Sequence, residues 1–169
     1  MITLDTLNAM DRAAFAKALG GIFEHSPWIA EAAWEHRPFA RLDDLHATMV
    51  DVVTRAGRDR RLALVRAHPE LAGEAMRQRL LTAASTGEQK GAGLDDLTAE
   101  DAARFDALNR QYRERFGFPF VIAVKGHDKD GILAAFARRL ANGQDEELET
   151  ALDQVARIAR FRLEAAVSP

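Results

Sequence analysis

Apolar residues recur along most of the chain at the three- and four-residue spacing of an amphipathic helix, and strict alternation of apolar and polar residues is nearly absent. The spacing predicts helices over residues 11–26, 28–36, 42–57, 59–68, 98–117, 129–142 and 145–167. Prolines and glycines stand where several of these helices are expected to end, as Pro69 and Gly117 illustrate. The chain has no internal repeat or linker, so it is expected to form one all-α domain over residues 1–169.

Two segments depart from the helical pattern. Residues 85–98 are rich in Gly, Ser, Thr and Asp, which predicts an ordered loop or a broken helix. Residues 118–124, "FPFVIAV", are apolar and predict one short extended segment. Its backbone N–H and C=O groups need hydrogen-bond partners, which either neighbouring loops or a bound polar ligand could supply.

Composition narrows the classes of function. A chain of 169 residues is long enough to bury a core, and its formal net charge of −3 argues against an electrostatic nucleic-acid binder. The absence of cysteine excludes disulfides, thiolate metal sites and a thiol nucleophile. The N-terminus lacks the features of a secretory signal, "AVSP" is no peroxisomal address, and "FPFVIAV" is too short to span a bilayer. A cytoplasmic protein that binds neither membrane nor nucleic acid is expected.

Searches for cofactor motifs are negative. The five histidines include no pair at HExxH spacing, and "DKDG" fails as a calcium loop because its register places Gly126 and Ala137 at ligand positions. "GAG" lacks the third glycine of a dinucleotide fingerprint, and no phosphate-binding GK[ST] is present. The sequence therefore predicts chemistry carried out by ordinary side chains and backbone groups, without metal or organic cofactor.

His68 is the first candidate for such chemistry. It stands directly before Pro69, and proline disfavours the α conformation in the residue that precedes it, so His68 is expected at a helix boundary. It could be a structural histidine bonded to a nearby carbonyl. It could also be a proton carrier, because an unperturbed imidazole titrates near neutrality (pKa ~6.5).

The segment 85–89, "STGEQ", is the second candidate, because it places a hydroxyl, a carboxylate and a carboxamide within five residues. In a structural interpretation Ser85 caps a helix and Glu88 completes a capping box. In a functional interpretation the same groups bind a ligand. Both can hold together, since free N–H groups at a helix start also bind anions.

Arg162 is the third candidate. Leu148, Leu152, Val155 and Ala159 recur at helical spacing, and the next step along this apolar stripe reaches Arg162. A buried guanidinium needs partners. An internal ion pair, a side chain that snorkels at the helix end and a two-point clamp for a carboxylate all remain open.

Several segments together resemble one enzyme family. These are "SPWIAEAAWEHRPF", "AHPELAG", "STGEQKGAGL", "FDALNRQYRERFGFPFVIAVKG" and "ARRLANGQDEELETALDQVARIARFRL". Over roughly residues 10–165 the chain resembles OHCU decarboxylases, which act on 2-oxo-4-hydroxy-4-carboxy-5-ureidoimidazoline in the last step from urate to allantoin.

The resemblance implies an all-helical homodimer that takes a small-molecule substrate and uses no cofactor. It implies that His68 is the catalytic acid/base and that Glu88 and Arg162 are essential partners. The residues that it implies line the substrate, the last five largely through their backbone, are Pro69, Ser85, Thr86, Gly87, Glu88, Gln89, Phe120, Val121, Ile122, Ala123 and Val124.

This substrate explains how decarboxylation to (S)-allantoin proceeds without a cofactor. Its carboxylate sits on a carbon next to a ring C=N bond, which can accept the electrons that departing carbon dioxide leaves. We hypothesise that His68 handles the proton on the hydroxyl-bearing carbon and that Glu88 orients or repolarises the imidazole. The stereospecific proton could come from His68 or from a water held by Glu88 and Gln89.

Two alternatives stand beside the decarboxylase. One is a catalytically silent helical interaction module, which would not need His68, Glu88 and Arg162 to converge. The other is a lyase or hydrolase of a related ureido compound that uses the same proton carrier.

Overall fold

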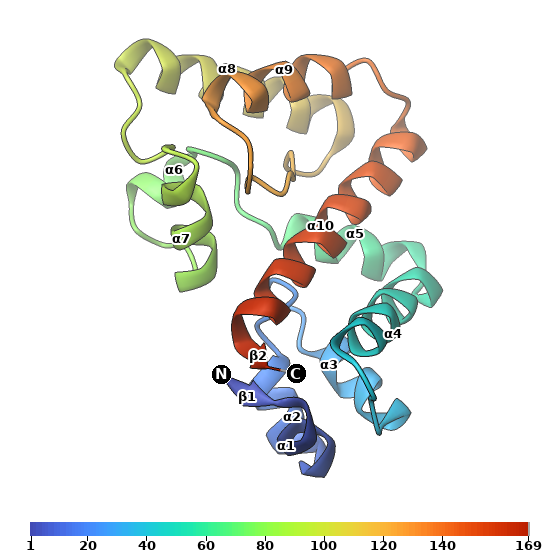
Figure 1. Cartoon of the computed structure of the whole chain (residues 1–169). Coiled ribbons are helices and arrows are strands. Elements are labelled where there is room, and N and C mark those ends of the chain that lie inside the picture. Colours follow the sequence, from blue (N-terminus) through green and yellow to red (C-terminus); the bar gives the residue numbers. More distant parts are fainter. Residues whose placement is uncertain (169) are drawn as a thin grey trace. The chain divides into compact units, whose positions relative to one another are not determined.

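Helices joined by short loops make up nearly all of the computed structural model, which describes residues 1–168 (Figure 1). In chain order the elements are β1 Ile2–Thr3, α1 Leu4–Ala9, α2 Arg12–Leu19, α3 Trp28–Ala33, the 3₁₀ helix η1 Trp34–His36, α4 Leu42–Arg55, α5 Arg58–Arg66, α6 Glu74–Arg77, α7 Ala83–Gly91, α8 Ala99–Phe116, α9 Lys129–Arg139, α10 Gln144–Ala166 and β2 Val167–Ser168. The prediction of an all-α fold is confirmed. The sequence pattern did not predict α1 or the two short strands, which pair in parallel with Ile2 beside Val167.

The contacts of the chain divide into two units. One unit contains Met1–Ala67 and the C-terminal residues from Val155, and the other contains His68–Gln154. In the first unit, α3 packs against α2 and α4, and its core includes the buried side chains of Phe15, Ile29 and Leu45. The expectation of one domain over the whole chain stays a prediction.

The second unit has an aromatic core. The rings of Phe120 and Phe136 stack with their centroids 3.7 Å apart, and the ring of Tyr112 meets Phe120 edge-on at 5.3 Å. Phe120 lies in the apolar segment 118–124, which the structure places between α8 and α9 with no strand partner among the described residues. The prediction of a non-helical segment here is confirmed, and its aromatic side chain is part of the core.

Capping residues, glycine and proline in the sequence predicted several helix ends correctly. The Thr98 hydroxyl accepts the N–H of Asp101 at 3.1 Å and so caps α8, while Gly117 adopts a left-handed conformation with φ 75° just after that helix. Helix α5 ends at Arg66, so His68 follows the helix as the proline rule predicted.

Two predicted boundaries were wrong. The helix expected over 11–26 ends at Leu19, because two consecutive glycines, Gly20 and Gly21, weaken helix formation there. Residues 85–98, predicted to be an ordered loop or a broken helix, are helical as far as Gly91, and this helix, α7, begins at Ala83. Its cap is Thr82, whose hydroxyl accepts the N–H of Ser85 at 3.2 Å, so Ser85 is not the cap and Glu88 completes no capping box with it.

Candidate functional site

His68 occupies a bend directly after α5 and is buried, with 7% of its surface exposed. Pro69 follows it and is half-buried. The forced helix end therefore removes the imidazole from the regular side-chain stripe of α5 and places it on irregular backbone. Such a position suits a group that reacts, because the following loop can set its orientation independently of the helix.

Helix α7 presents two buried polar side chains on one face. Ser85 and Gln89 lie four residues apart, which places them on the same side of a helix, and they are 3% and 2% exposed. Thr86 and Glu88 are half-buried, and Gly87 is exposed. A Cβ atom added at Gly87 would meet open space, so sterics do not require glycine there.

Gln89 connects α7 to the loop that carries His68. Its Oε1 accepts the N–H of Ala72 at 2.9 Å, and its Nε2 donates to the carbonyl of Glu70 at 3.3 Å. A carboxamide has two N–H donors and two acceptor lone pairs, so these two bonds use half of its capacity. Gln89 therefore links α7 to this loop, a structural role that was not expected from the sequence, which had suggested a substrate contact or a residue that holds a water.

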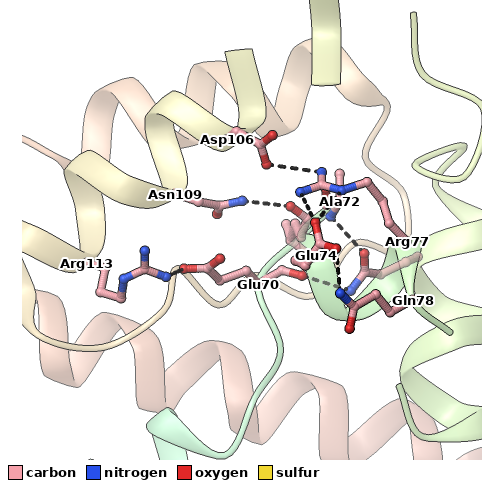
Figure 2. A network of polar contacts seen from close by, with 10 residues as sticks. Glu70, Ala72, Glu74, Arg77, Gln78, Asp106, Asn109 and Arg113 are labelled. Atoms are coloured by element: carbon pink, nitrogen blue, oxygen red, sulfur yellow. Dashed lines mark hydrogen bonds and ion pairs between the residues drawn. The ribbon is translucent and has the colours of Figure 1, made fainter. Parts of the chain in front are cut away.

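Other side chains hold the same loop, as Figure 2 shows. Asn109 of α8 donates to the carbonyl of Leu71 at 2.8 Å, and Arg77 of α6 donates to the carbonyl of Ala72 at 2.9 Å. Arg113 pairs with the Glu70 carboxylate. Ala72 has φ 50°, a conformation that costs a non-glycine residue energy and persists only where surrounding contacts enforce it. The loop after His68 is therefore held by side chains from three helices.

The segment Phe120–Val124 is buried throughout, with exposed fractions between 1% and 7%. Its anchors are side chains of α9 and α10. Arg139 donates to the carbonyl of Val121 at 2.6 Å, and the N–H of Ala123 donates to Oε1 of Gln154 at 3.1 Å. Neighbouring side chains, and not loops, thus supply the partners that the sequence required for these two backbone groups.

Arg139 belongs to a buried polar cluster that sequence reasoning missed. Its side chain pairs with the fully buried carboxylate of Glu147 at 2.5 Å, and this carboxylate also accepts from Tyr112 and from Asn142. Burial, and then the hydrogen bond to Glu147, raise the pKa of the Tyr112 hydroxyl far above its ordinary value, so it stays a neutral donor. A signal was present, because steps of four from Val155 through Ala151 lead back to Glu147 on one helical face.

Arg162 lies in the other unit and is buried, with 8% exposed, as its place on the apolar stripe predicted. Its Nη1 donates to Oε2 of Glu24 at 2.7 Å and approaches the carbonyl of Gly21 at 3.4 Å. Glu24 is 2% exposed and was not singled out from the sequence. The internal ion pair that the sequence left open is therefore present, and it fixes the position of the guanidinium.

The second unit thus contains His68, Pro69, the segment Ser85–Gln89 and the strip Phe120–Val124, whereas Arg162 belongs to the first. Within residues 1–168, no group of three or more histidine or acidic side chains is arranged to hold a metal ion. Every helix in the described part of the chain is too short or too polar to cross a membrane.

Comparison with known proteins gives consistent matches over this chain. The model of the family described as OHCU decarboxylase matches residues 8–164. The 2-oxo-4-hydroxy-4-carboxy-5-ureidoimidazoline decarboxylase of Haloferax volcanii is 46% identical over 162 residues, which are 96% of this chain and 94% of that protein. The uric acid degradation bifunctional protein PucL of Bacillus subtilis is 43% identical over 96% of this chain, which spans 32% of that protein. The crystal structure of (S)-allantoin synthase matches with a TM-score of 0.80 at 31% identity, covering 99% of this chain and 54% of that chain.

Proposed function

The chain belongs to the OHCU decarboxylase family, and we propose that His68, Glu88 and Arg162 carry out its reaction. It is a carboxy-lyase of urate degradation that converts 2-oxo-4-hydroxy-4-carboxy-5-ureidoimidazoline to (S)-allantoin. The observation that carries this function is the 46% identity to the Haloferax volcanii enzyme over nearly the full length of both chains.

The substrate supplies its own electron sink. The bond between the ring carbon and the carboxylate breaks and carbon dioxide leaves. The electron pair forms a C=C bond to the adjacent imine carbon, while the π electrons of the C=N bond move to the nitrogen, which takes a proton. The resulting enol then loses its hydroxyl proton, and the ureido-bearing carbon gains one to give allantoin. The protein has to orient the carboxylate, move protons and select one face of that carbon.

His68 is the proton carrier in this proposal. This role is supported by the buried position of His68, because Gln89, Asn109 and Arg77 hydrogen-bond to the loop that follows it. A loop held in this way keeps a reacting group in place without help from the substrate, which lowers the entropic cost of reaching the transition state. Glu88, half-buried on α7, orients or repolarises the imidazole.

Arg162 grips the substrate carboxylate in this proposal. A guanidinium can hold a carboxylate with two parallel hydrogen bonds, and the buried pair with Glu24 holds the Arg162 side chain in one orientation. We further propose, as the family resemblance implies, that other residues line the substrate. Those that follow His68 or lie on α7 are Pro69, Ser85, Thr86, Gly87 and Gln89. The strip Phe120–Val124 lines it largely through its backbone groups.

The assembly and location are also part of the proposal. We place the protein in the cytoplasm with one functional domain, as the sequence analysis expects, and propose that it is a homodimer, as the resemblance implies. Support for a single functional domain is that the family match at residues 8–164 runs through both structural units.

Circular dichroism during the enzymatic oxidation of urate tests the function. Urate oxidase and hydroxyisourate hydrolase generate the substrate, and the signal of optically active allantoin is followed with and without this protein. We expect that signal to appear faster with the protein. If it appears only at the spontaneous, racemising pace, the enzymatic function is wrong, and a helical interaction module becomes the leading hypothesis.

A further inference from the structure

The peptide groups before and after Ile122 are each held by a hydrogen bond to a side chain. The peptide before it contains the carbonyl of Val121, which accepts from Nη1 of Arg139 at 2.6 Å. The peptide after it contains the N–H of Ala123, which donates to Oε1 of Gln154 at 3.1 Å. Both anchors are side chains of the same structural unit, so these contacts describe one local arrangement.

Peptide geometry determines where the groups of Ile122 point. Both peptides are trans, since the cis bond of the described chain is Arg37–Pro38. In a planar trans peptide the C=O and N–H point in opposite directions. The N–H of Ile122 therefore points away from Arg139, and its C=O points away from Gln154.

Neither of these two groups of Ile122 has a partner in the part of the chain that the structure describes. Within residues 1–168 neither makes a hydrogen bond, although the residue is only 7% exposed. Buried backbone polar groups are nearly always paired, because leaving one unpaired costs free energy. A donor and an acceptor on one residue are thus presented to a ligand that carries the complementary pair.

The arginine that sets this geometry is itself held on several sides. Its Nε donates to Oε1 of Glu147 at 2.6 Å, and its guanidinium lies 4.3 Å from the centre of the Phe120 ring. Asn142 donates to the second oxygen of Glu147 at 2.8 Å, which fixes the carboxylate in turn. The hydrogen bond from Arg139, whose side chain is fixed in this way, therefore sets the orientation of the Val121 carbonyl.

We propose that Arg139 and Gln154 are positioning residues that direct the N–H and C=O of Ile122 at the ureido or ring amide group of the substrate. This inference rests on the proposed function and goes beyond it, because it assigns a role to two residues outside the substrate-lining set. Ureido and cyclic amide groups carry an N–H beside a C=O, which matches the pair on Ile122. The two residues contact the backbone of the strip, so we expect them to act on binding and not on the proton transfer.

The test compares two replacements of Gln154, which is half-buried. Gln154→Met removes the acceptor at similar side-chain length, and Gln154→Glu keeps an acceptor oxygen. We expect Gln154→Met to raise KM about tenfold, the effect of roughly one lost hydrogen bond, with kcat unchanged. Gln154→Glu is expected to keep a KM near that of the wild type.

A matched control comes from the same helix. Gln144 donates to the carbonyl of Phe116 at 2.8 Å, a side chain-to-backbone bond outside the strip. Gln144→Met should therefore leave KM unchanged. A wild-type KM in Gln154→Met, or an equal rise in KM in Gln144→Met, would overturn the inference.

A readout without catalysis separates this inference from the proposed function. The amide resonance of Ile122 is followed by NMR while (S)-allantoin is added to the wild type and to Gln154→Met. We expect a shift in the wild type that is much smaller in the variant. If the wild type lacks decarboxylase activity but its Ile122 amide still responds in this way, the function fails and the positioning role stands. An Ile122 amide that does not respond in an active wild type refutes the role alone.

Discussion

Arg77 and Arg139 both donate a hydrogen bond to a backbone carbonyl, but Arg77 is exposed to solvent and Arg139 is buried. Each donates to a backbone carbonyl of a segment proposed to serve the substrate, that of Ala72 after His68 and that of Val121 in the apolar strip. Each is held by a glutamate, Glu74 for Arg77 and Glu147 for Arg139. The side chains of Arg77 and Glu74 are 43% and 64% exposed, whereas those of Arg139 and Glu147 are 10% and 0% exposed.

The difference in exposure changes how much each ion pair contributes to the stability of the fold. Solvent screens the pair at Arg77, so it adds little to stability, and the loop needs the further ties from Gln89 and Asn109. The pair at Arg139 is shielded from water, where losing one partner leaves an uncompensated charge. The loop after His68, the proposed proton carrier, is thus secured by a solvent-screened ion pair together with hydrogen bonds from other side chains, whereas the apolar strip is secured through a buried ion pair.

The largest effect is expected at His68, the proposed proton carrier. His68→Asn should lower kcat by about 10²–10⁴-fold, the usual contribution of a positioned acid/base group, while the loop ties remain. Turnover is measured by the dichroism assay, and thermal unfolding shows whether the fold is kept. His36→Asn, at an exposed histidine, is the control. Wild-type turnover in His68→Asn would remove His68 from the mechanism.

The next effect is expected at the buried anchor. Glu147→Gln leaves Arg139 without its counter-charge inside the protein, so the free energy of unfolding should fall by about 3–5 kcal/mol. Urea unfolding followed by circular dichroism measures this change. Glu146→Gln is the control, because Glu146 is an exposed neighbour on the same helix. Equal, small losses in both variants would contradict the view that burial distinguishes the two arginines.

The smallest effect is expected at the exposed anchor, and it should depend on pH. The hydrogen bond from Arg77 holds the pKa of the Glu74 carboxyl below its ordinary value of 4.5. A lowered pKa means that the pair stabilises the fold above pH 4.5 and that this contribution is lost as the pH falls through the native pKa. Glu74→Gln should therefore be slightly less stable than the wild type at neutral pH, and the difference should vanish on acidification.

Urea midpoints of both proteins at a series of pH values measure this difference. Added salt should reduce it at neutral pH, because the pair is exposed to solvent. A difference that persists in acid, or that is as large as the loss in Glu147→Gln, would show that Glu74 acts through something other than its charge.

Much of the fold followed from the sequence because helix signals are local. Thr98, Gly117 and Pro69 marked boundaries that the structure confirms, since capping, left-handed backbone and proline sterics act within a few residues. The start of α7 was missed because Thr82 competes with Ser85 for the role of cap, and both residue types suit it. Local chemistry alone did not decide between them.

The sequence by itself determined the family, the helical class, the candidates His68 and Glu88, and the burial of Arg162, because motifs and helical periodicity are written in residue order. Only the tertiary structure decided which groups hold those residues. Glu24 meets Arg162 across 138 positions, Asn109 meets Leu71 across 38, and Arg139 meets Val121 across 18. Such pairings depend on how helices pack, and neither propensity nor periodicity encodes them, because both describe a residue only through its near neighbours along the chain.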